Sequence, residues 1–572
     1  MAHSRQLAEL KSKTAQLYND SHNPFLHLQR GYVHEALGLP DCSAADAYRS
    51  LTLLESVIDP DGYEFHATRR ASTNTNGHGN GDASCSAIVG NCQSVISDDY
   101  ESAVDIDNPA QGGHDFVPIT IDEYNSTIGD VYVLLVRCLV RCDCLRDAYE
   151  FAVRAISMIG DLASGSSRDR NIEDLTRMVE DIKRIYFTRK GITSCNGSHF
   201  DASLLPAQGY AQRILYPWNE HEPDRKASKT LELLNARLKH VAPKCEVRAV
   251  ALPALHDTDG DISIQLGLFA KEDIRPGEIL LRETSLLTAT NRLHDDICDA
   301  CNAPLPGLSF PEPPVPCVNC EDTYFCSRTC HDRAQETYHA AVCGREALES
   351  IGKDIPDATD KADYLYLLLL GRALAMSATQ DIHPLDLPEV KYIWGDFHDF
   401  SSHSNHNAGS NEKNMLPFSF HLTILQPMRL VEEMGLDPFT TLPRYDTWIL
   451  NTLYAKFRGT ASGRLSTWDG GPEVCAVHPL WCLANHSCDP NVRWEWGGEI
   501  TFSVRGKGER AGWKGANKEE GRDCTIKKDD EILNHYCDIG LDVKERREWA
   551  RGALGGFCRC ERCLYESGEM YE

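Results

Sequence analysis

The hydrophobic positions in the first part of the chain repeat three and four residues apart, as they do on one face of a helix. Such runs cover residues 25–37, 44–58 and 124–158. Asn23-Pro24 precedes the first run and Gly38-Leu39-Pro40 follows it, and these residue types are typical of a helix start and stop. We therefore predict two helical regions, over residues 1–70 and 116–240.

Two of these runs carry small side chains beside a tyrosine, which suits helices that cross closely. They are Ala44, Ala45, Ala47 and Tyr48 in one run, and Ala148, Tyr149, Ala152 and Ala155 in the other. The pattern resembles tetratricopeptide repeats, and a plain bundle of helical hairpins is the alternative. Between the two regions, residues 71–115 are rich in Ser, Asn, Gly and Asp. They cannot bury enough apolar surface to offset ordering entropy, so we predict a disordered linker.

From Val247 onward the pattern changes to short strands. Strand-like runs cover 247–252, 262–269 and 279–281, and short strands return after residue 475. A cysteine-rich stretch and a helical stretch separate the two groups of strands. This order predicts an α+β multidomain protein whose β-rich core is split by inserts and preceded by helices. The first half of the core is predicted over 245–297, the cysteine-rich segment over 298–343 and the helical insert over 344–456. The second half of the core is predicted over 457–556, and a C-terminal cysteine segment over 557–572.

The composition of the chain argues against some classes of binding partner. The net charge of −27 over 572 residues argues against bulk attraction to nucleic acid or to an anionic membrane. It permits a basic partner, such as a lysine-rich protein segment. No apolar run reaches the roughly 18–20 residues of a membrane span, and the first residues lack the apolar core of a secretory signal. We expect an intracellular protein, in the cytoplasm, the nucleus or both.

The 23 cysteines are clustered rather than scattered. With no secretory signal, such clustering indicates metal ligands rather than disulfides. Eight candidate ligands at Cys-x2-Cys, Cys-x3-Cys and His-x3-Cys spacing would suit two tetrahedral, structural zinc sites. They are Cys298, Cys301, Cys317, Cys320, Cys326, Cys330, His339 and Cys343.

The spacing and the terminal His-x3-Cys resemble a MYND zinc finger. The resemblance implies interleaved sites, with Cys298, Cys301, Cys326 and Cys330 on one zinc and Cys317, Cys320, His339 and Cys343 on the other. A sequential arrangement, with the first four ligands on one metal, is the alternative. Related modules bind proline-rich peptides, so the resemblance implies a proline-rich or other peptide partner.

Three further motifs follow in order along the chain. They are Asn485-His486-Ser487-Cys488-Asp489-Pro490-Asn491, the block 531–538 that contains Tyr536, and Phe557-Cys558-Arg559-Cys560-Glu561-Arg562-Cys563. With Gly267-Leu268-Phe269-Ala270 before them, they resemble the SET methyltransferases over residues 245–566. The inserted zinc module is the arrangement of the SMYD group. We expect the usual C-terminal helices of that group to be missing and the N-terminal helices to cover the substrate cleft instead.

The resemblance implies transfer of a methyl group from S-adenosylmethionine to a lysine of a protein substrate, histone or non-histone. Tyr536 would be catalytic and also contact the cofactor. The other implied cofactor residues are Gly267, Leu268, Asn451, Asn485, His486 and Phe557. Cys488, Cys558, Cys560 and Cys563 would hold a third zinc. A narrow apolar channel would lower the pKa of the substrate lysine by desolvation.

Two positions depart from the family pattern. Gln265 stands where the cofactor loop usually has its first glycine, and Gly555-Gly556 precede Phe557 where a second aromatic is common. These departures leave a second hypothesis open. The chain would then be a non-catalytic adaptor that binds peptides through its helices and its zinc finger.

Overall fold

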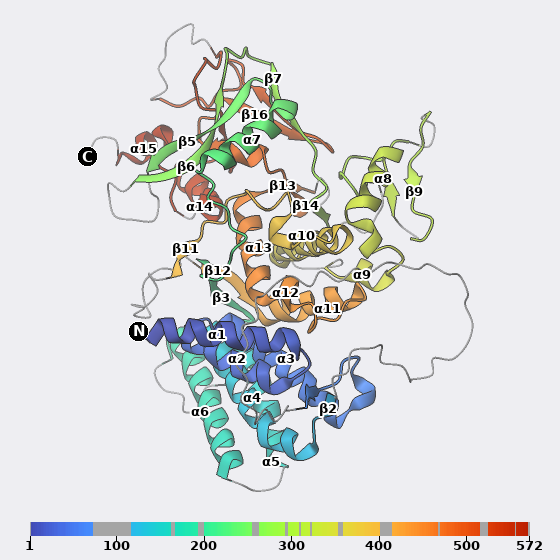
Figure 1. The fold of residues 1–572 in the computed structure, drawn as a ribbon. Coiled ribbons are helices and arrows are strands. Elements are labelled where there is room, and N and C mark those ends of the chain that lie inside the picture. The colour runs from blue at the N-terminus through green and yellow to red at the C-terminus, as the bar shows by residue number, and fades with distance from the viewer. Residues whose placement is uncertain are drawn as a thin grey trace, which may run out of the picture.

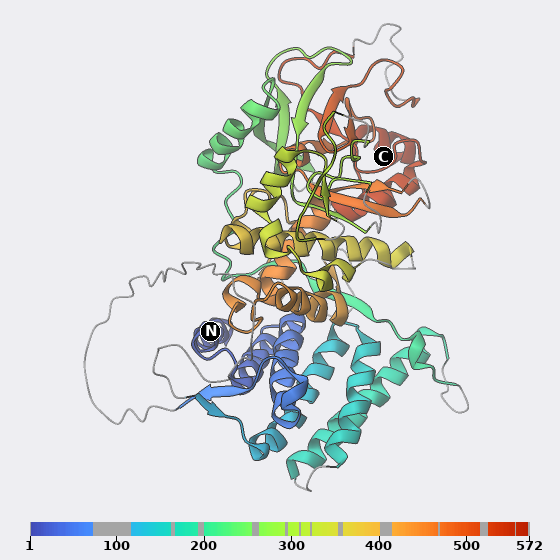
Figure 2. The same ribbon diagram turned by 90° about the vertical axis from the view of Figure 1, so that its right-hand side faces the viewer.

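The computed structural model shows a mixed helical and stranded protein, with a helical N-terminal part at one end and a β-rich part at the other (Figure 1 and Figure 2). The predicted linker over 71–115 lies outside the described residues except for Ala71. The structure describes residues 2–71, 116–161, 166–192, 199–253, 262–291, 296–307, 311–320, 323–352, 358–400, 415–466, 470–514, 524–554 and 556–569.

The N-terminal helical region is confirmed. Its helices are α1 (Ala2–Asn19), α2 (Pro24–Ala36), α3 (Pro40–Ile58), α4 (Ile121–Arg141), α5 (Leu145–Gly160) and α6 (Ser166–Arg189). The strands β1 (Thr68–Arg70) and β2 (Phe116–Pro118) pair beside them. The helices start where local signals predict. The Asn23 side chain accepts hydrogen bonds from the first turn of α2, and Thr120 and Glu123 form a capping box on α4.

Two of the helical hairpins are built alike. One left-handed residue lies two positions before the second helix of each pair, Gly38 before α3 and Asp143 before α5. Fully buried small residues then recur at equal spacing, and they are Ser43, Ala47 and Ser50 in α3 and Ala148, Ala152 and Ala155 in α5. Small side chains at this spacing let neighbouring helices approach closely. The hairpins thus share a geometry as well as a sequence pattern.

The region predicted as helical over 116–240 also contains strands. β3 (Gln208–Gln212) pairs antiparallel with β12 (Met415–Ser419), and β4 (Ile214–Leu215) pairs parallel with β11 (His398–Asp399). Both partners lie in the helical insert, about 200 residues later. α7 (Ser228–Val241) follows, within the region predicted as helical. These strand pairs join the N-terminal part to the insert.

The β-rich part consists of small sheets. β5 (Cys245–Pro253) and β6 (Ile262–Ala270) form a hairpin. β7 (Ile279–Glu283), β16 (Val492–Trp496) and β17 (Ile500–Val504) form a second sheet. β8 (Thr288–Thr290), β13 (Ala461–Leu465) and β14 (Pro472–Val477) form a third. β15 (Asn485–His486) pairs with β18 (Leu533–Asn534), and the helices α14 (Val543–Leu554) and α15 (Glu561–Ser567) complete this part.

The cysteine-rich segment packs beside the helical insert (Figure 1). It contains β9 (Val315–Pro316), β10 (Tyr324–Phe325) and α8 (Arg328–Thr337), and the insert contains α9 (Glu346–Ser350), α10 (Ala358–Gln380), α11 (Gln426–Glu433), α12 (Leu442–Tyr445) and α13 (Thr447–Thr460). Arg372 of α10 joins the two. Its guanidinium lies 3.6 Å from the Tyr338 ring centre and 3.1 Å from an oxygen of Asp299. The cysteine-rich segment is therefore held by a buried cation.

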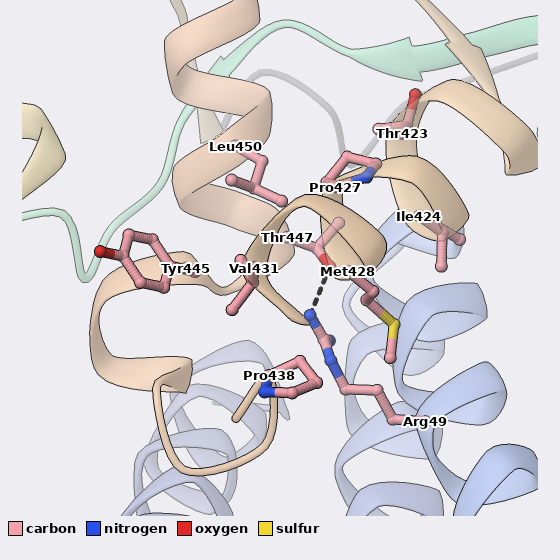
Figure 3. Close-up of a pocket in the computed structure, with 10 residues that line it drawn as sticks. All are labelled: Arg49, Thr423, Ile424, Pro427, Met428, Val431, Pro438, Tyr445, Thr447 and Leu450. Atoms are coloured by element: carbon pink, nitrogen blue, oxygen red, sulfur yellow. Dashed lines mark hydrogen bonds between the residues drawn. The ribbon is translucent and has the colours of Figure 1, made fainter. Parts of the chain in front are cut away.

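A buried ion cluster joins the N-terminal helices to the start of α13. Arg30 binds Asp46 at 2.5 Å and Asp446 at 2.8 Å, and Arg49 lies 3.3 Å from Asp446. Figure 3 shows Arg49 reaching Thr447 across a small apolar cavity between the two parts. Burial alone would raise the pKa of Asp46, but Arg30 and a hydrogen bond from His34 hold it well below its ordinary value.

We expect Asp446→Asn to lower the free energy of unfolding by about 3–5 kcal/mol, because Arg30 and Arg49 would lose a shared buried counter-charge. Urea unfolding followed by circular dichroism would measure the change. Asp181→Asn is the matched control, since its ion pair with Arg184 is exposed and exposed pairs contribute roughly 1 kcal/mol or less. Equal effects of the two substitutions would contradict the role assigned to the cluster.

The two longest apolar runs, over 131–136 and 364–370, lie in α4 and α10 and are largely buried. Across the described ranges, no helix has both the length and the apolar character that crossing a bilayer requires.

Candidate active site

Two segments almost fifty residues apart form the centre of the site. β15 runs parallel to β18, and the Ser487 backbone N–H donates to the Asn534 carbonyl at 2.8 Å. The Asn491 side chain continues this pairing, because its Nδ2 donates to the Glu531 carbonyl at 2.7 Å and its Oδ1 accepts from the Leu533 N–H at 2.8 Å. The last asparagine of the heptapeptide therefore aligns the later motif against the first one.

This pairing brings Tyr536 beside His486. The two ring centres lie 5.2 Å apart, and the Tyr536 backbone N–H donates to Nδ1 of His486 at 3.0 Å. The phenol hydroxyl donates to the Ala484 carbonyl at 2.9 Å. Burial raises the pKa of the phenol well above its ordinary value, so it stays protonated at neutral pH. Tyr536 thus presents a fixed, neutral hydroxyl.

Both ring nitrogens of His486 contact protein atoms. Nδ1 accepts from Tyr536, and Nε2 lies 3.3 Å from the Cys488 sulfur. Burial lowers the pKa of His486 to about 4, so the ring is neutral at physiological pH. The imidazole therefore connects Tyr536 with the cysteine cluster behind it. A cofactor would contact His486 through atoms other than the two ring nitrogens.

Gly267 lies where a side chain would not fit. A Cβ at this position would come within 2.7 Å of the Glu531 carboxylate and 3.1 Å of the Asn485 amide. The Asn485 amide donates to that carboxylate at 2.7 Å and to the Leu266 carbonyl at 3.1 Å. The glycine in β6 thus permits the close approach of β6, β15 and the 531 segment.

Glu283 supports the turn that leads into β15. Its carboxylate accepts hydrogen bonds from the backbone N–H groups of Leu480 and Trp481, at the start of the 3₁₀ helix η8 (Trp481–Leu483). Burial raises the pKa of Glu283 to about 7, and the N–H donors counteract the rise only in part. Ala484 and Asn485 follow directly, so this carboxyl fixes the backbone that holds the Tyr536 hydroxyl.

Four cysteines converge behind His486. The sulfurs of Cys488, Cys558, Cys560 and Cys563 all lie within 4.8 Å of one another. Arg562 ties the same segment down, since it donates to the carbonyls of Cys488 and Ile539 at 2.9 Å. The C-terminal tail is thereby joined to the middle of the heptapeptide.

The cysteine-rich segment forms two more clusters, in the interleaved order. Cys298, Cys301, Cys326 and Cys330 form one, and Cys317, Cys320, His339 and Cys343 form the other. Sulfur separations of 3.6 Å and 3.9 Å in the first cluster match the edge of about 3.8 Å of a tetrahedron with Zn–S bonds of about 2.3 Å. They are far longer than a disulfide bond, which is about 2.05 Å. The donor atoms thus fit zinc.

Residues 265–537 match the family model of the SET domain. The chain contains a SET domain. The matched range includes the cysteine-rich segment and the helical insert. SET domains are in general protein lysine methyltransferases that use S-adenosylmethionine.

The structure brings some predicted residues of the SET domain together and separates others. Asn485, His486, Tyr536 and Gly267 lie at the junction of β6, β15 and the 531–536 segment. Leu268 has a fully buried side chain in the hydrophobic core, so only its backbone faces this junction. Phe557 adjoins the third cluster and is 48% exposed.

Asn451 lies elsewhere. It is buried in α13, where its amide donates to Asp41 at 2.7 Å and lies 3.4 Å from the Tyr216 hydroxyl. Among the described residues, its hydrogen bonds therefore go to Asp41 of α3 and to Tyr216, and none goes to another predicted cofactor residue. Its assignment rested on a loose motif match, and a lone asparagine in a helix carries no information about the face it occupies.

No role was predicted from the sequence for Asn491, Glu531 or Glu283. Asn491 ends the heptapeptide 485–491 and Glu531 begins the block 531–538, so their positions in these two motifs could have indicated a role at the site. Glu283 ends an ordinary strand, and nothing in the local sequence distinguishes its carboxyl from an exposed one. Only the packing of β7 under η8 shows its role.

Proposed function

We propose that this protein transfers the methyl group of S-adenosylmethionine to a lysine side chain of a protein substrate. The observation that carries the proposal is the position of Tyr536, whose buried hydroxyl is fixed on Ala484 one residue before the Asn485-His486 pair. A fixed, neutral phenol can orient an amine and accept a positive centre on its aromatic face. The SET domain match supports the same reaction.

The cofactor supplies a methyl group attached to a positively charged sulfur. Asn485, the backbone around Gly267 and the aromatic ring of Phe557 are the residues that would hold it. Oδ1 of Asn485 has no hydrogen-bond partner among the described residues, whereas its Nδ2 is used internally. A free carbonyl oxygen suits the ammonium or a hydroxyl of the cofactor.

Zinc is the metal we assign to the three clusters, one ion each. All three are four-ligand sets of thiolates, or of thiolates and one imidazole, which leaves no open position for catalysis. The 298–343 segment would be a MYND-type finger with a capacity for peptide binding. The third zinc would hold the C-terminal tail as one wall of the site.

Calorimetric titration with S-adenosylmethionine and S-adenosylhomocysteine tests the proposal. We expect both to bind the wild-type protein, and Asn485→Ala to weaken binding at least tenfold. Asn451→Ala is the matched control, since both asparagines donate to a carboxylate at 2.7 Å. We expect Asn451→Ala to leave cofactor affinity unchanged.

Transfer of a labelled methyl group to proteins of a cell extract is the second measurement. Absence of binding at millimolar cofactor concentration would refute the proposed enzymatic activity. Binding without any transfer would favour the adaptor, in which the helices and the zinc finger recruit peptides.

A further inference from the structure

The backbone of Glu531 is held by two segments of the candidate active site. Glu531 forms an antiparallel bridge with Phe269 of β6, and the next residue, Ile532, donates its backbone N–H to the Leu268 carbonyl at 2.7 Å. The Asn491 side chain donates to the Glu531 carbonyl, also at 2.7 Å. Because β6 and the heptapeptide both fix this backbone, the position of the Glu531 side chain is restricted as well.

The Asn485 amide has one orientation that suits its neighbours. Its Nδ2 donates to Oε1 of Glu531 at 2.7 Å and to the Leu266 carbonyl at 3.1 Å. Both partners are acceptors, so a carbonyl oxygen in the place of Nδ2 would face them without any hydrogen bond. The amino end of the amide is therefore turned toward these two groups. Its Oδ1, which has no partner among the described residues, is left for a donor from elsewhere.

The hydrogen bond with Glu531 is the shorter of the two, and it is charge-assisted whenever the carboxyl is ionised. Burial raises the pKa of Glu531, and the hydrogen bond from Asn485 counteracts the rise. The hydrogen bond requires only an acceptor oxygen, so the carboxylate and the protonated carboxyl can both make it. Glu531 is therefore suited to hold the Asn485 amide in either protonation state.

The neighbouring glycine leaves the space that this pair of side chains occupies. A Cβ at Gly267 would lie 2.7 Å from Oε1 of Glu531 and 3.1 Å from Nδ2 of Asn485, the two atoms that form the hydrogen bond. Any larger residue at this position of β6 would push them aside. The absence of a side chain at 267 thus preserves the contact between Glu531 and Asn485.

We propose that Glu531 is a positioning residue, which fixes the Asn485 amide so that Oδ1 can accept a hydrogen bond from the cofactor. The inference rests on the proposed function and adds a residue to it. An amide that could turn over would present Nδ2 to the cofactor, and an amino group cannot accept from an ammonium or a hydroxyl. An amide that is already oriented also loses less freedom when the cofactor binds. Glu531 thus raises cofactor affinity through Asn485.

A double-mutant cycle, measured by calorimetric titration with S-adenosylhomocysteine, tests this role. We expect Glu531→Ala to weaken binding about tenfold, the usual effect of losing one hydrogen bond to a carboxyl group. In the Asn485→Ala background the same substitution should have no further effect, because the residue through which it acts is gone. Glu531→Gln should bind the cofactor nearly as well as the wild type, since the glutamine oxygen can accept from Nδ2.

Reversing donor and acceptor is a second test, and it does not depend on removing either side chain. Asn485→Asp places a new carboxyl against two acceptors, Glu531 and the Leu266 carbonyl, so we expect binding to weaken by at least about tenfold at neutral pH. Adding Glu531→Gln to this variant supplies an amide donor and should restore part of the affinity. A residue with a packing role alone would not help one background and leave the other unchanged.

Asp130→Ala is the matched control. Asp130 lies in α4 and accepts a hydrogen bond from the Asn171 amide of α6 at 3.0 Å. A glycine adjoins this pair too, since a Cβ at Gly129 would collide with the Asn171 amide. The same three residue types thus meet in the N-terminal helices. We expect Asp130→Ala to lower the thermal stability about as much as Glu531→Ala does and to leave cofactor affinity unchanged.

Unchanged affinity in Glu531→Ala, or equal weakening by this substitution with and without Asn485, would overturn the inference while cofactor binding stands. A Glu531→Gln variant that binds poorly and brings no recovery to Asn485→Asp would overturn it as well. A wild-type protein that binds neither S-adenosylmethionine nor S-adenosylhomocysteine would refute the proposed function itself.

Discussion

Tyr536→Phe is expected to slow methyl transfer on the order of 10²–10³-fold while leaving cofactor affinity unchanged. The hydroxyl is a preorganised group at the reacting centre, and removing one such group from an active site typically has an effect of this size. The substitution keeps the ring that packs on His486 and removes only the atom bonded to the Ala484 carbonyl. Single-turnover transfer of labelled methyl at saturating cofactor is the measurement.

Tyr454→Phe is the control for this experiment. Tyr454 is also a buried tyrosine whose hydroxyl donates to a backbone carbonyl, that of Leu422 at 3.0 Å, but it lies in α13 within the insert. We expect its loss to affect stability slightly and transfer hardly at all. If both substitutions slow transfer equally, Tyr536 has only a structural role.

Cys560→Ser is expected to remove one zinc of three and to abolish methyl transfer. Structural zinc contributes about 10–16 kcal/mol to the folding of small modules, and the tail from 556 to 569 has little core of its own. Without the metal, Cys488 would no longer be linked to Cys558 and Cys563. The C-terminal tail behind His486 would then become less ordered. Metal analysis by mass spectrometry, together with limited proteolysis of the tail, would show the loss.

Cys537→Ser is the control for the metal experiment. Cys537 is buried beside the third cluster, within reach of His486 and Cys488, but it is not one of the four converging ligands. We expect this variant to retain three zinc ions and most of its activity. Retention of three ions by Cys560→Ser, or loss of one by Cys537→Ser, would show that the ligand set is assigned wrongly.

Local signals account for much of what could be predicted. Asn23 and Thr120 mark helix starts through hydrogen bonds made within three residues. Ligand spacing predicted the cysteine clusters, because a metal needs donors at short, regular intervals. The SET domain was predicted from the resemblance of the heptapeptide at 485–491 and the later motifs to a known family.

Contacts between distant residues could not be predicted in this way. Arg30 and Asp446 are 416 positions apart, and no local pattern in either segment indicates the other. The strand pairs that join the N-terminal part to the insert are equally remote in sequence. The contacts of Asn451 could not be predicted either, because they depend on which helices pack against α13.

The sequence by itself determined most of the helical regions, the candidate metal ligands and the motifs of the SET domain, because these depend on residues that act over a few positions. Tertiary structure alone decided between the interleaved and the sequential order of the ligands, and it alone showed that Glu283 supports the turn before Asn485. The physical reason is that burial and charge depend on what packs around a group, and those neighbours come from segments hundreds of residues away.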